Sequence, residues 1–349
     1  MKKKIDIRQL SLEQLTDEIV KLGEKPYRAK QVHQWLWKKR VIDFDQMTNL
    51  SKSFRKLIEN NFIINALVLS EAQISSDKTI KNAFLLADKS VIEGVLIPTK
   101  KRMTACVSVH VGCSLDCAFC ATGKLKRIRN LNADEIYDQV VMINDQSQKE
   151  YSMPISNIVY MGMGEPLLNY KNVLLSVDRI TSEDGLGMSA KRITISTAGI
   201  HKKIVRLADD KVKFNLALSL HAANDEKRNK IMPINESNSL NSLKEAMIYF
   251  SEMTGTRPTL EYIIFKDFND EISDAEELVQ FAKSFPSKIN IIEYNSIDEG
   301  KYQQATVKKV DAFASYLESK NLIVNIRRSR GKDIDAACGQ LANKNELAR

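Results

Sequence analysis

From about residue 130 onwards, the sequence alternates between short apolar runs and amphipathic stretches. The runs are rich in β-branched residues, as strands are, whereas the stretches between them carry apolar residues at helical spacing. The runs are SNIVYMG, RITISTA, KFNLALSL, TLEYIIF, KINIIEYN and LIVNIRR, and the helical stretches include YKNVLLSVDRIT, HKKIVRLAD, SLKEAMIYFSEM, DAEELVQFAKSF and VDAFASYLESK. Repeated units of this kind pack as a parallel sheet with helices outside, so we expect an α/β fold that closes wholly or partly into a barrel. In such barrels the functional residues lie at the carboxyl ends of the strands.

Two smaller regions precede the expected barrel. Residues 1–70 contain three helical patterns, SLEQLTDEIVKLG, KPYRAKQVHQWLWKKR and LSKSFRKLIENNF, of which the first begins with a capping serine and ends at a glycine. Short β-branched runs then replace the helical period. We therefore predict a small helical domain over 1–70, a β-rich connector over 71–104, and the barrel core over 105–349 with a C-terminal segment.

Charge and composition bound the class of protein only loosely. Lys and Arg outnumber Asp and Glu by 52 to 44 in 349 residues, which suits a polyanionic partner but is common in enzymes too. The sequence has an odd number of cysteines, five, with no apolar leader and no long apolar run. These features predict a cytoplasmic protein that does not associate with a membrane.

Four of the five cysteines fall in the stretch CVSVHVGCSLDCAFC. Cys113, Cys117 and Cys120 have a C-x3-C-x2-C spacing, and no fourth cysteine lies nearby to close a structural zinc site. Three thiolates on one loop can instead hold three irons of a [4Fe–4S] cluster and leave the fourth iron open to a ligand. Buried cysteines or a partial zinc site are the simpler alternatives, and the aromatic Phe119 before the last cysteine disfavours them.

Polar residues follow several of the predicted strands. They are Gly164 and Glu165 in MGMGEP, Ser196 in ISTAG, Ser219, Leu220 and His221 in SLH, and Asn295 in EYN. Singly, each has an ordinary explanation, such as a tight turn, a helix cap or a core histidine. Their recurrence at successive strand ends favours a ligand-binding site at the mouth of the barrel.

The cysteine triplet at the end of the first barrel strand resembles that of the radical S-adenosylmethionine (SAM) superfamily. This resemblance implies a partial (βα)6 barrel of the TIM-like kind, with Cys113, Cys117 and Cys120 holding the cluster. It also implies that SAM binds the open iron and is cleaved to a 5′-deoxyadenosyl radical. Glu165 would accept the SAM amino group, and the other strand-end residues would line the cofactor.

Longer stretches are similar to the RlmN-type 23S ribosomal RNA adenine-C2 methyltransferases. They are RGKDIDAACGQL, MGMGEPLLNY, SLHAANDEKRNKIMPIN and KPYRAKQVHQWLWKKRVIDFDQMTNLSK, and the likeness runs from about residue 8 to 342. Members act on 23S rRNA and on adenosine 37 of transfer RNAs. The resemblance implies that one SAM methylates Cys338, and that the radical from a second SAM lets the resulting S-methyl carbon add to C2 of adenine.

The same resemblance gives roles to two further residues. Cys106 would remove the C2 proton and form a transient disulfide with Cys338, which releases the methylated RNA. Glu93 would act as an acid–base residue. The family also implies a flavodoxin- or ferredoxin-type electron donor and a monomeric enzyme.

Basic segments are the candidate RNA contacts: residues 124–130 (KLKRIRN), and KPYRAK and WLWKKR near the N-terminus. The family commonly has Ser-Gln where this chain has Val109 and His110, and Gly-Phe where it has Lys126 and Arg127. We expect both differences to alter RNA contacts without touching a SAM position.

Three other interpretations remain open from the sequence. A related antibiotic-resistance enzyme shares all five cysteines but methylates C8 of adenine. A non-enzymatic iron–sulfur RNA-binding protein would need the triplet but not Cys106 and Cys338. A structural zinc protein would be colourless.

Overall fold

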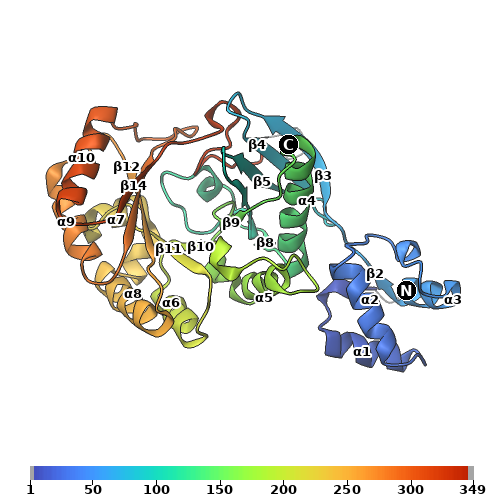
Figure 1. Ribbon diagram of the computed structural model, residues 1–349. Coiled ribbons are helices and arrows are strands. Elements are labelled where there is room, and N and C mark those ends of the chain that lie inside the picture. Colours follow the sequence, from blue (N-terminus) through green and yellow to red (C-terminus); the bar gives the residue numbers. More distant parts are fainter. Residues whose placement is uncertain (1–3, 345–349) are drawn as a thin grey trace.

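The computed structural model describes residues 4–344. Its centre is one ten-stranded sheet in the order β14-β13-β12-β11-β10-β9-β6-β5-β4-β3 (Figure 1). The strands are β3 (Val68–Ile74), β4 (Ile80–Leu85), β5 (Val91–Pro98), β6 (Met103–Cys106), β9 (Asn157–Tyr160), β10 (Ile193–Thr197), β11 (Asn215–Ser219), β12 (Thr259–Ile264), β13 (Lys288–Glu293) and β14 (Val324–Arg327). The β3–β6 pairs are antiparallel, and all pairs from β6 to β14 are parallel.

Helices follow the parallel strands in turn and cover one side of the sheet. They are α4 (Ala133–Tyr151), α5 (Tyr170–Thr181), α6 (His201–Asp209), α7 (Asp225–Ile231), α8 (Leu240–Thr254), α9 (Ile272–Ala282) and α10 (Val307–Ser319). Figure 1 shows α6, α8, α9 and α10 along the outer side of β10–β14. The six expected βα units are confirmed, and β14 adds a seventh parallel strand. Among the described strands β14 and β3 are the edges, so the barrel is open.

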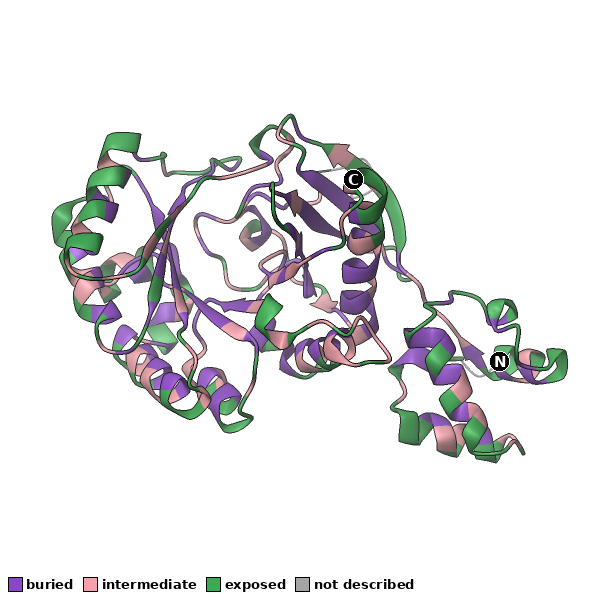
Figure 2. Cartoon of the chain, in the orientation of Figure 1, coloured by how far each residue is buried: buried purple, intermediate pink, exposed green. Residues whose placement is uncertain are grey.

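Burial explains why the strands read as near-continuous apolar runs. A parallel strand with helices outside and side chains inside loses water from both faces. In Figure 2 the inner strands are largely buried, whereas the outward faces of the helices are exposed. In β12, for example, Leu260, Tyr262 and Ile264 are fully buried, and Glu261 points into the barrel at 3 % exposure. Among residues 4–344, no helix is both long and apolar enough to cross a membrane.

The N-terminal unit consists of α1 (Leu12–Lys21), α2 (Tyr27–Trp37) and α3 (Lys52–Asn61). The three helices lie inside the predicted stretches, and the capping box between Ser11 and Gln14 is present at α1. The sequence did not predict the short parallel pair β1 (Ile5–Asp6) and β2 (Phe62–Ile63), because two-residue strands have no periodicity to detect.

Buried contacts attach this unit to α4 and α5. Arg8 donates to both carboxylate oxygens of Asp138, at 2.9 and 2.8 Å. The edge of the Tyr137 ring packs on Trp37 with the ring centroids 5.5 Å apart. Arg179 stacks over Trp37 and donates to Nε2 of His33 at 2.8 Å. The helical unit is therefore seated on the first two helices of the barrel.

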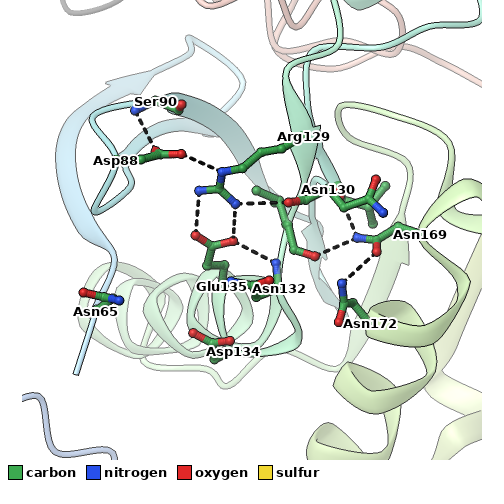
Figure 3. A network of polar contacts seen from close by, with 12 residues as sticks. Asn65, Asp88, Ser90, Arg129, Asn130, Asn132, Asp134, Glu135, Asn169 and Asn172 are labelled. Carbon is green, nitrogen blue, oxygen red and sulfur yellow. Dashed lines mark hydrogen bonds and ion pairs between the residues drawn. The ribbon is translucent and has the colours of Figure 1, made fainter. Parts of the chain in front are cut away.

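A second polar network fixes the chain that follows the cysteine loop (Figure 3). Arg129 in β8 (Arg129–Asn130) makes two 2.8 Å bonds to Glu135 at the start of α4, and one of 2.6 Å to Asp88 in the β4–β5 turn. Its guanidinium is thus engaged within the fold, and its contact with RNA stays a prediction. In the same segment, Lys124 and Lys126 are exposed.

Candidate active site at the cysteine loop

The cysteine triplet lies on the loop between β7 (His110–Val111) and the short helix η3 (Ala121–Lys124). Burial raises the pKa of Cys117, and the neighbouring Cys120 and Cys113 raise it further because their thiolates would repel a third negative charge. Burial raises the pKa of Cys120 as well, an effect partly offset by hydrogen bonds from the backbone N–H groups of Gly123 and Thr122. The three thiols therefore lie close together in a place where ionisation is costly.

This arrangement fits a bound iron–sulfur cluster. Three neighbouring buried thiolates are stable only when positive charge compensates them, and cluster irons supply that charge. Residues 4–344 contain no group of three His, Cys, Asp or Glu side chains around one ion position. A [4Fe–4S] cluster does not require such a group, since each cysteine binds a different iron.

Arg228 is a neighbour of the loop that the sequence analysis missed. It is fully buried, and its guanidinium donates to the carbonyl oxygens of Leu220, Ala198 and Ser219 at 3.0, 2.6 and 3.1 Å. Its charge lowers the pKa of Cys117 and opposes the effect of burial. The sequence placed Arg228 in the charged run NDEKRNK, which resembles an exposed helix face and gives no sign of burial.

Glu165 and Gly164 lie where β9 leads into the site. Glu165 is 3 % exposed, and its carboxylate accepts from Leu167 N, Thr197 Oγ1 and Ala198 N at 2.9, 2.7 and 2.7 Å. These bonds fix the carboxylate beside the cysteine loop, where burial raises its pKa. The position suits an acceptor for an ammonium group.

Gly164 is required by the backbone at this point. Its φ is +96°, and an added Cβ would come within 2.5 Å of the His110 ring. His110 is fully buried, and its Nδ1 accepts the N–H of Glu165 at 3.3 Å. The His110 side chain therefore supports the Gly164–Glu165 turn, and an effect of this residue on RNA contacts stays a prediction.

Ser196 and Ser219 meet at the ends of β10 and β11, with their hydroxyl oxygens 3.2 Å apart. Asn295 follows β13, and its Nδ2 donates to the carbonyl oxygen of Cys338 at 3.1 Å. The Oδ1 atom of Asn295 is buried and has no hydrogen-bond partner among the described residues. A buried acceptor without a partner is costly, so this atom is suited to accept from a bound ligand.

Leu220 and His221 are occupied by the fold itself. Leu220 is fully buried; its N–H donates to Glu261 O and its carbonyl accepts from Arg228. His221 accepts the N–H of Ile263 at 3.1 Å, and its ring contacts the Phe119 ring edge-on at a centroid distance of 4.7 Å. Their contribution to cofactor binding stays a prediction, while His221 packs against the cysteine loop through Phe119.

Cys338 returns to this site from the segment after β14. It is exposed, yet protein surrounds it closely enough that burial raises the pKa of its thiol to about 11, with Arg327 opposing the shift and Cys120 adding to it. Burial raises the pKa of Cys106 to about 12, and Cys338 contributes to that shift. The two thiols distant in sequence are thus neighbours, and all five cysteines are free.

Glu93 in β5 lies at the other end of the same segment. It is 1 % exposed, and its Oε2 accepts the N–H groups of Ala342 and Asn343 at 2.9 and 3.0 Å. The other oxygen, Oε1, lies 3.7 Å from Lys81 Nζ. The carboxylate therefore fastens the chain just after Cys338.

Two more charged residues of the site were not predicted. Arg327 of β14 reaches Oε2 of Glu261 at 3.4 Å and the sulfur of Met161 at 4.0 Å. The effect of Arg327 on the pKa values of Cys106 and Cys338 places it beside both thiols. An acidic residue in the otherwise apolar run TLEYIIF was the available signal for Glu261.

Two family descriptions match the chain. Residues 5–64 match the ribosomal RNA large subunit methyltransferase N-terminal domain, and residues 107–282 match the radical SAM superfamily. The chain is 59 % identical to a dual-specificity RNA methyltransferase RlmN of Cytophaga hutchinsonii, over 98 % of this chain and 94 % of the relative. Identity to the protein of the same name from Fervidobacterium nodosum is 42 %, over 97 % of each chain.

A solved structure is similar over the full length. The crystal structure of a radical SAM methyltransferase from Sphaerobacter thermophilus superposes with a TM-score of 0.90 at 35 % identity. It covers 97 % of this chain and 99 % of its own. The helical unit, the connector and the barrel therefore all have counterparts in one known enzyme.

Proposed function

Because this chain belongs to the RlmN family of radical SAM RNA methyltransferases, we propose that it methylates C2 of an adenine in 23S rRNA and of adenosine 37 in transfer RNAs. One observation carries the proposal. Hydrogen bonds from Ala121 and Thr122 hold the segment that carries Cys338 against the loop that carries Cys120, and the charge of a Cys338 thiolate contributes to the raised pKa of Cys106. A radical SAM protein that only bound RNA would have no use for two further thiols at its cysteine triplet.

The cofactors supply chemistry that side chains cannot. A [4Fe–4S] cluster with SAM provides the methyl group and the radical, and the protein orients and shields them. Cys113, Cys117 and Cys120 would hold the cluster. Glu165 would accept the SAM amino group, and Ser196, Ser219 and Asn295 lie at neighbouring strand ends where they can bind the rest of the molecule.

Cys338 is the proposed methyl carrier. Its thiolate attacks the methyl carbon of the first SAM, which forms the S–CH3 bond while S-adenosylhomocysteine leaves. A second SAM bound at the cluster would supply the radical that takes one hydrogen atom from this methyl group, and Cys338 would hold the resulting methylene carbon toward C2 of adenine. Burial raises the pKa of Cys338 and so disfavours the thiolate that this transfer needs. The positive charge of Arg327 opposes that rise and stabilises the thiolate.

Cys106 is proposed to complete the reaction. A thiolate at this position would take the C2 proton from the radical adduct. As its sulfur then bonds to Cys338, the carbon–sulfur bond to the RNA would break, the same proton would complete the new methyl group, and the unpaired electron of the adduct would pass to the oxidised cluster as acceptor. That step leaves a disulfide between Cys106 and Cys338, which a reductant must open before the next turnover. Glu93 is the proposed acid–base partner, and since its Oε2 is held by two backbone N–H groups, Oε1 is the oxygen left for proton transfer.

The decisive experiment is an anaerobic reaction of the reconstituted protein with SAM, a chemical reductant and 23S rRNA, followed by mass spectrometry of the nucleosides. The expected product is 2-methyladenosine. Methylation at C8 alone would identify the antibiotic-resistance activity instead. A colourless protein with one zinc would overturn the cluster assignment, which calls for about four irons per chain.

The remaining partners follow from the same proposal. A flavodoxin or ferredoxin would reduce the cluster, and the enzyme would act as a monomer in the cytoplasm, where its RNA substrates are. Lys124 and Lys126 are exposed beside the cysteine loop and are available to RNA phosphates.

A further inference from the structure

The segment that carries Cys338 is bonded directly to the loop that carries the cluster ligands. The N–H of Ala121 donates to the carbonyl oxygen of Gly339 at 2.7 Å, and the Thr122 hydroxyl donates to the carbonyl oxygen of Leu341 at 2.6 Å. Ala121 and Thr122 immediately follow Cys120, and Gly339 and Leu341 flank the turn after Cys338. The position of the methyl-carrying thiol is therefore linked to that of the cysteine loop.

The backbone conformation makes this link short. Gly339 has a φ of +84°, and a Cβ at this residue would lie 3.1 Å from the Phe119 carbonyl oxygen. The absence of a side chain lets the two segments pass at close range. Asn295 holds the Cys338 carbonyl from the opposite direction. Cys338 is thus fixed between a strand end and the cysteine loop.

Within residues 4–344, Thr122 provides the one side-chain bond between the cysteine loop and the Cys338 segment. It is 3 % exposed and Leu341 is 5 % exposed, so water cannot readily replace the hydroxyl. Removal of a buried donor leaves its acceptor unsatisfied, which is unfavourable. Loss of this bond would therefore weaken the attachment of the Cys338 segment to the cysteine loop.

We propose that Thr122 is a positioning residue, which uses its hydroxyl to hold the Cys338 segment over the cluster loop so that Cys338 meets the methyl group of SAM. The inference rests on the proposed function and extends it. The hydroxyl takes no part in bond making. Through this bond the position of the Cys338 thiol depends on the conformation of the cysteine loop.

The test uses Thr122→Val, which keeps the β-branched shape and removes the donor, in the anaerobically reconstituted holoenzyme. We expect unchanged iron content, about tenfold slower methylation of Cys338 by intact-protein mass spectrometry, and faster amide hydrogen exchange over residues 338–343. Thr122→Ser, which keeps the hydroxyl, should restore both readouts. Thr254→Val is the matched control, because its hydroxyl also donates to a carbonyl, Phe250 O at 2.7 Å, on α8 away from the site.

Each other outcome counts against the inference. Wild-type methylation and exchange in Thr122→Val would show that the bond is dispensable. Loss of iron would assign the hydroxyl to the cluster itself, and failure of Thr122→Ser to restore function would exclude the hydrogen bond as the cause. Failure of the proposed function is a separate result, since wild-type protein would then carry no methyl group on Cys338 at all.

Discussion

At the scale of single residues, the site depends on buried groups whose partners come from distant parts of the chain. The two carboxylates of Glu165 and Glu93 illustrate this. Each accepts backbone N–H groups, and each thereby fixes a neighbouring segment: the end of β10 for Glu165 and the chain after Cys338 for Glu93. Such groups affect chemistry both by what they contact and by what they hold in place.

Variants that lack Cys338 or Cys106 should stop the proposed reaction at different steps. Cys338→Ala has no methyl acceptor, so we expect cluster and SAM binding to persist while the protein-bound methyl group never forms. Cys106→Ala keeps the acceptor but lacks the releasing thiol, so a covalent protein–RNA adduct should accumulate. Gel mobility and intact-mass measurements distinguish the two. Normal RNA methylation by both variants would refute the two-cysteine mechanism.

Glu93 allows its holding role and its proposed acid–base role to be separated. Glu93→Gln retains an oxygen for the N–H groups of Ala342 and Asn343 but cannot exchange a proton at neutral pH. We expect methylation of Cys338 near the wild-type rate and RNA methylation at least tenfold slower, in line with the usual contribution of a general acid or base. Glu93→Ala should lose both activities. Unchanged RNA methylation in Glu93→Gln would leave Glu93 with the holding role alone.

At the scale of secondary-structure elements, apolar periodicity predicted the strands and helices well, because each buries one face or both. The strand-end rule also located Glu165, Ser196 and Asn295, since parallel strands present their carboxyl ends at one edge of the sheet. Arg228 and Arg129 could not be found this way. From the sequence alone, charged residues are expected at the surface, because their hydrogen-bond acceptors lie elsewhere in the chain. The fold brings three carbonyl groups to Arg228 and two carboxylates to Arg129.

The contact between α2 and α5 should make stability depend on pH. His33 accepts from Arg179 through Nε2, and burial together with the Arg179 charge lowers its pKa from 6.5 to about 4. Between these values the unfolded chain binds the proton and the folded chain does not, so the free energy of unfolding falls as pH drops from about 6.5 to 4. The effect should reach roughly 3 kcal/mol, at about 1.4 kcal/mol per pKa unit.

Thermal unfolding of wild type and His33→Gln across this pH range measures the effect. Glutamine offers an acceptor that does not titrate here, so the difference in stability between the two proteins should shift in favour of His33→Gln as the solution is acidified. If the stabilities of the two proteins changed equally with pH, His33 would not contribute to the pH dependence of stability.

At the scale of the whole molecule, the helical unit and the barrel are joined by a buried cation. Arg8 is 4 % exposed at its side chain and pairs with Asp138 at 2.8 Å and Asp134 at 3.4 Å. Arg8→Met would leave these carboxylates buried without a counter-charge, so we expect a loss of roughly 3–5 kcal/mol in the free energy of unfolding. Denaturant unfolding measures this change.

Arg55→Met is the matched control within the same unit. Arg55 pairs with Asp45, whose side chain is 89 % exposed, so its removal should cost less than about 1 kcal/mol. Equal costs for the two substitutions would mean that burial of the Arg8 pairs does not strengthen the attachment of the helical unit.

The path of the chain has a consequence for how the enzyme is made. All strands of the sheet and the three proposed cluster ligands precede Cys338 in the sequence, and the bonds from Ala121 and Thr122 to residues 339 and 341 close over the cysteine loop only after that segment exists. During synthesis the strands and the cysteine triplet therefore leave the ribosome before the proposed methyl acceptor does. A chain cut between β14 and Cys338 would keep every proposed ligand of the cluster and yet lack the thiol proposed to receive a methyl group.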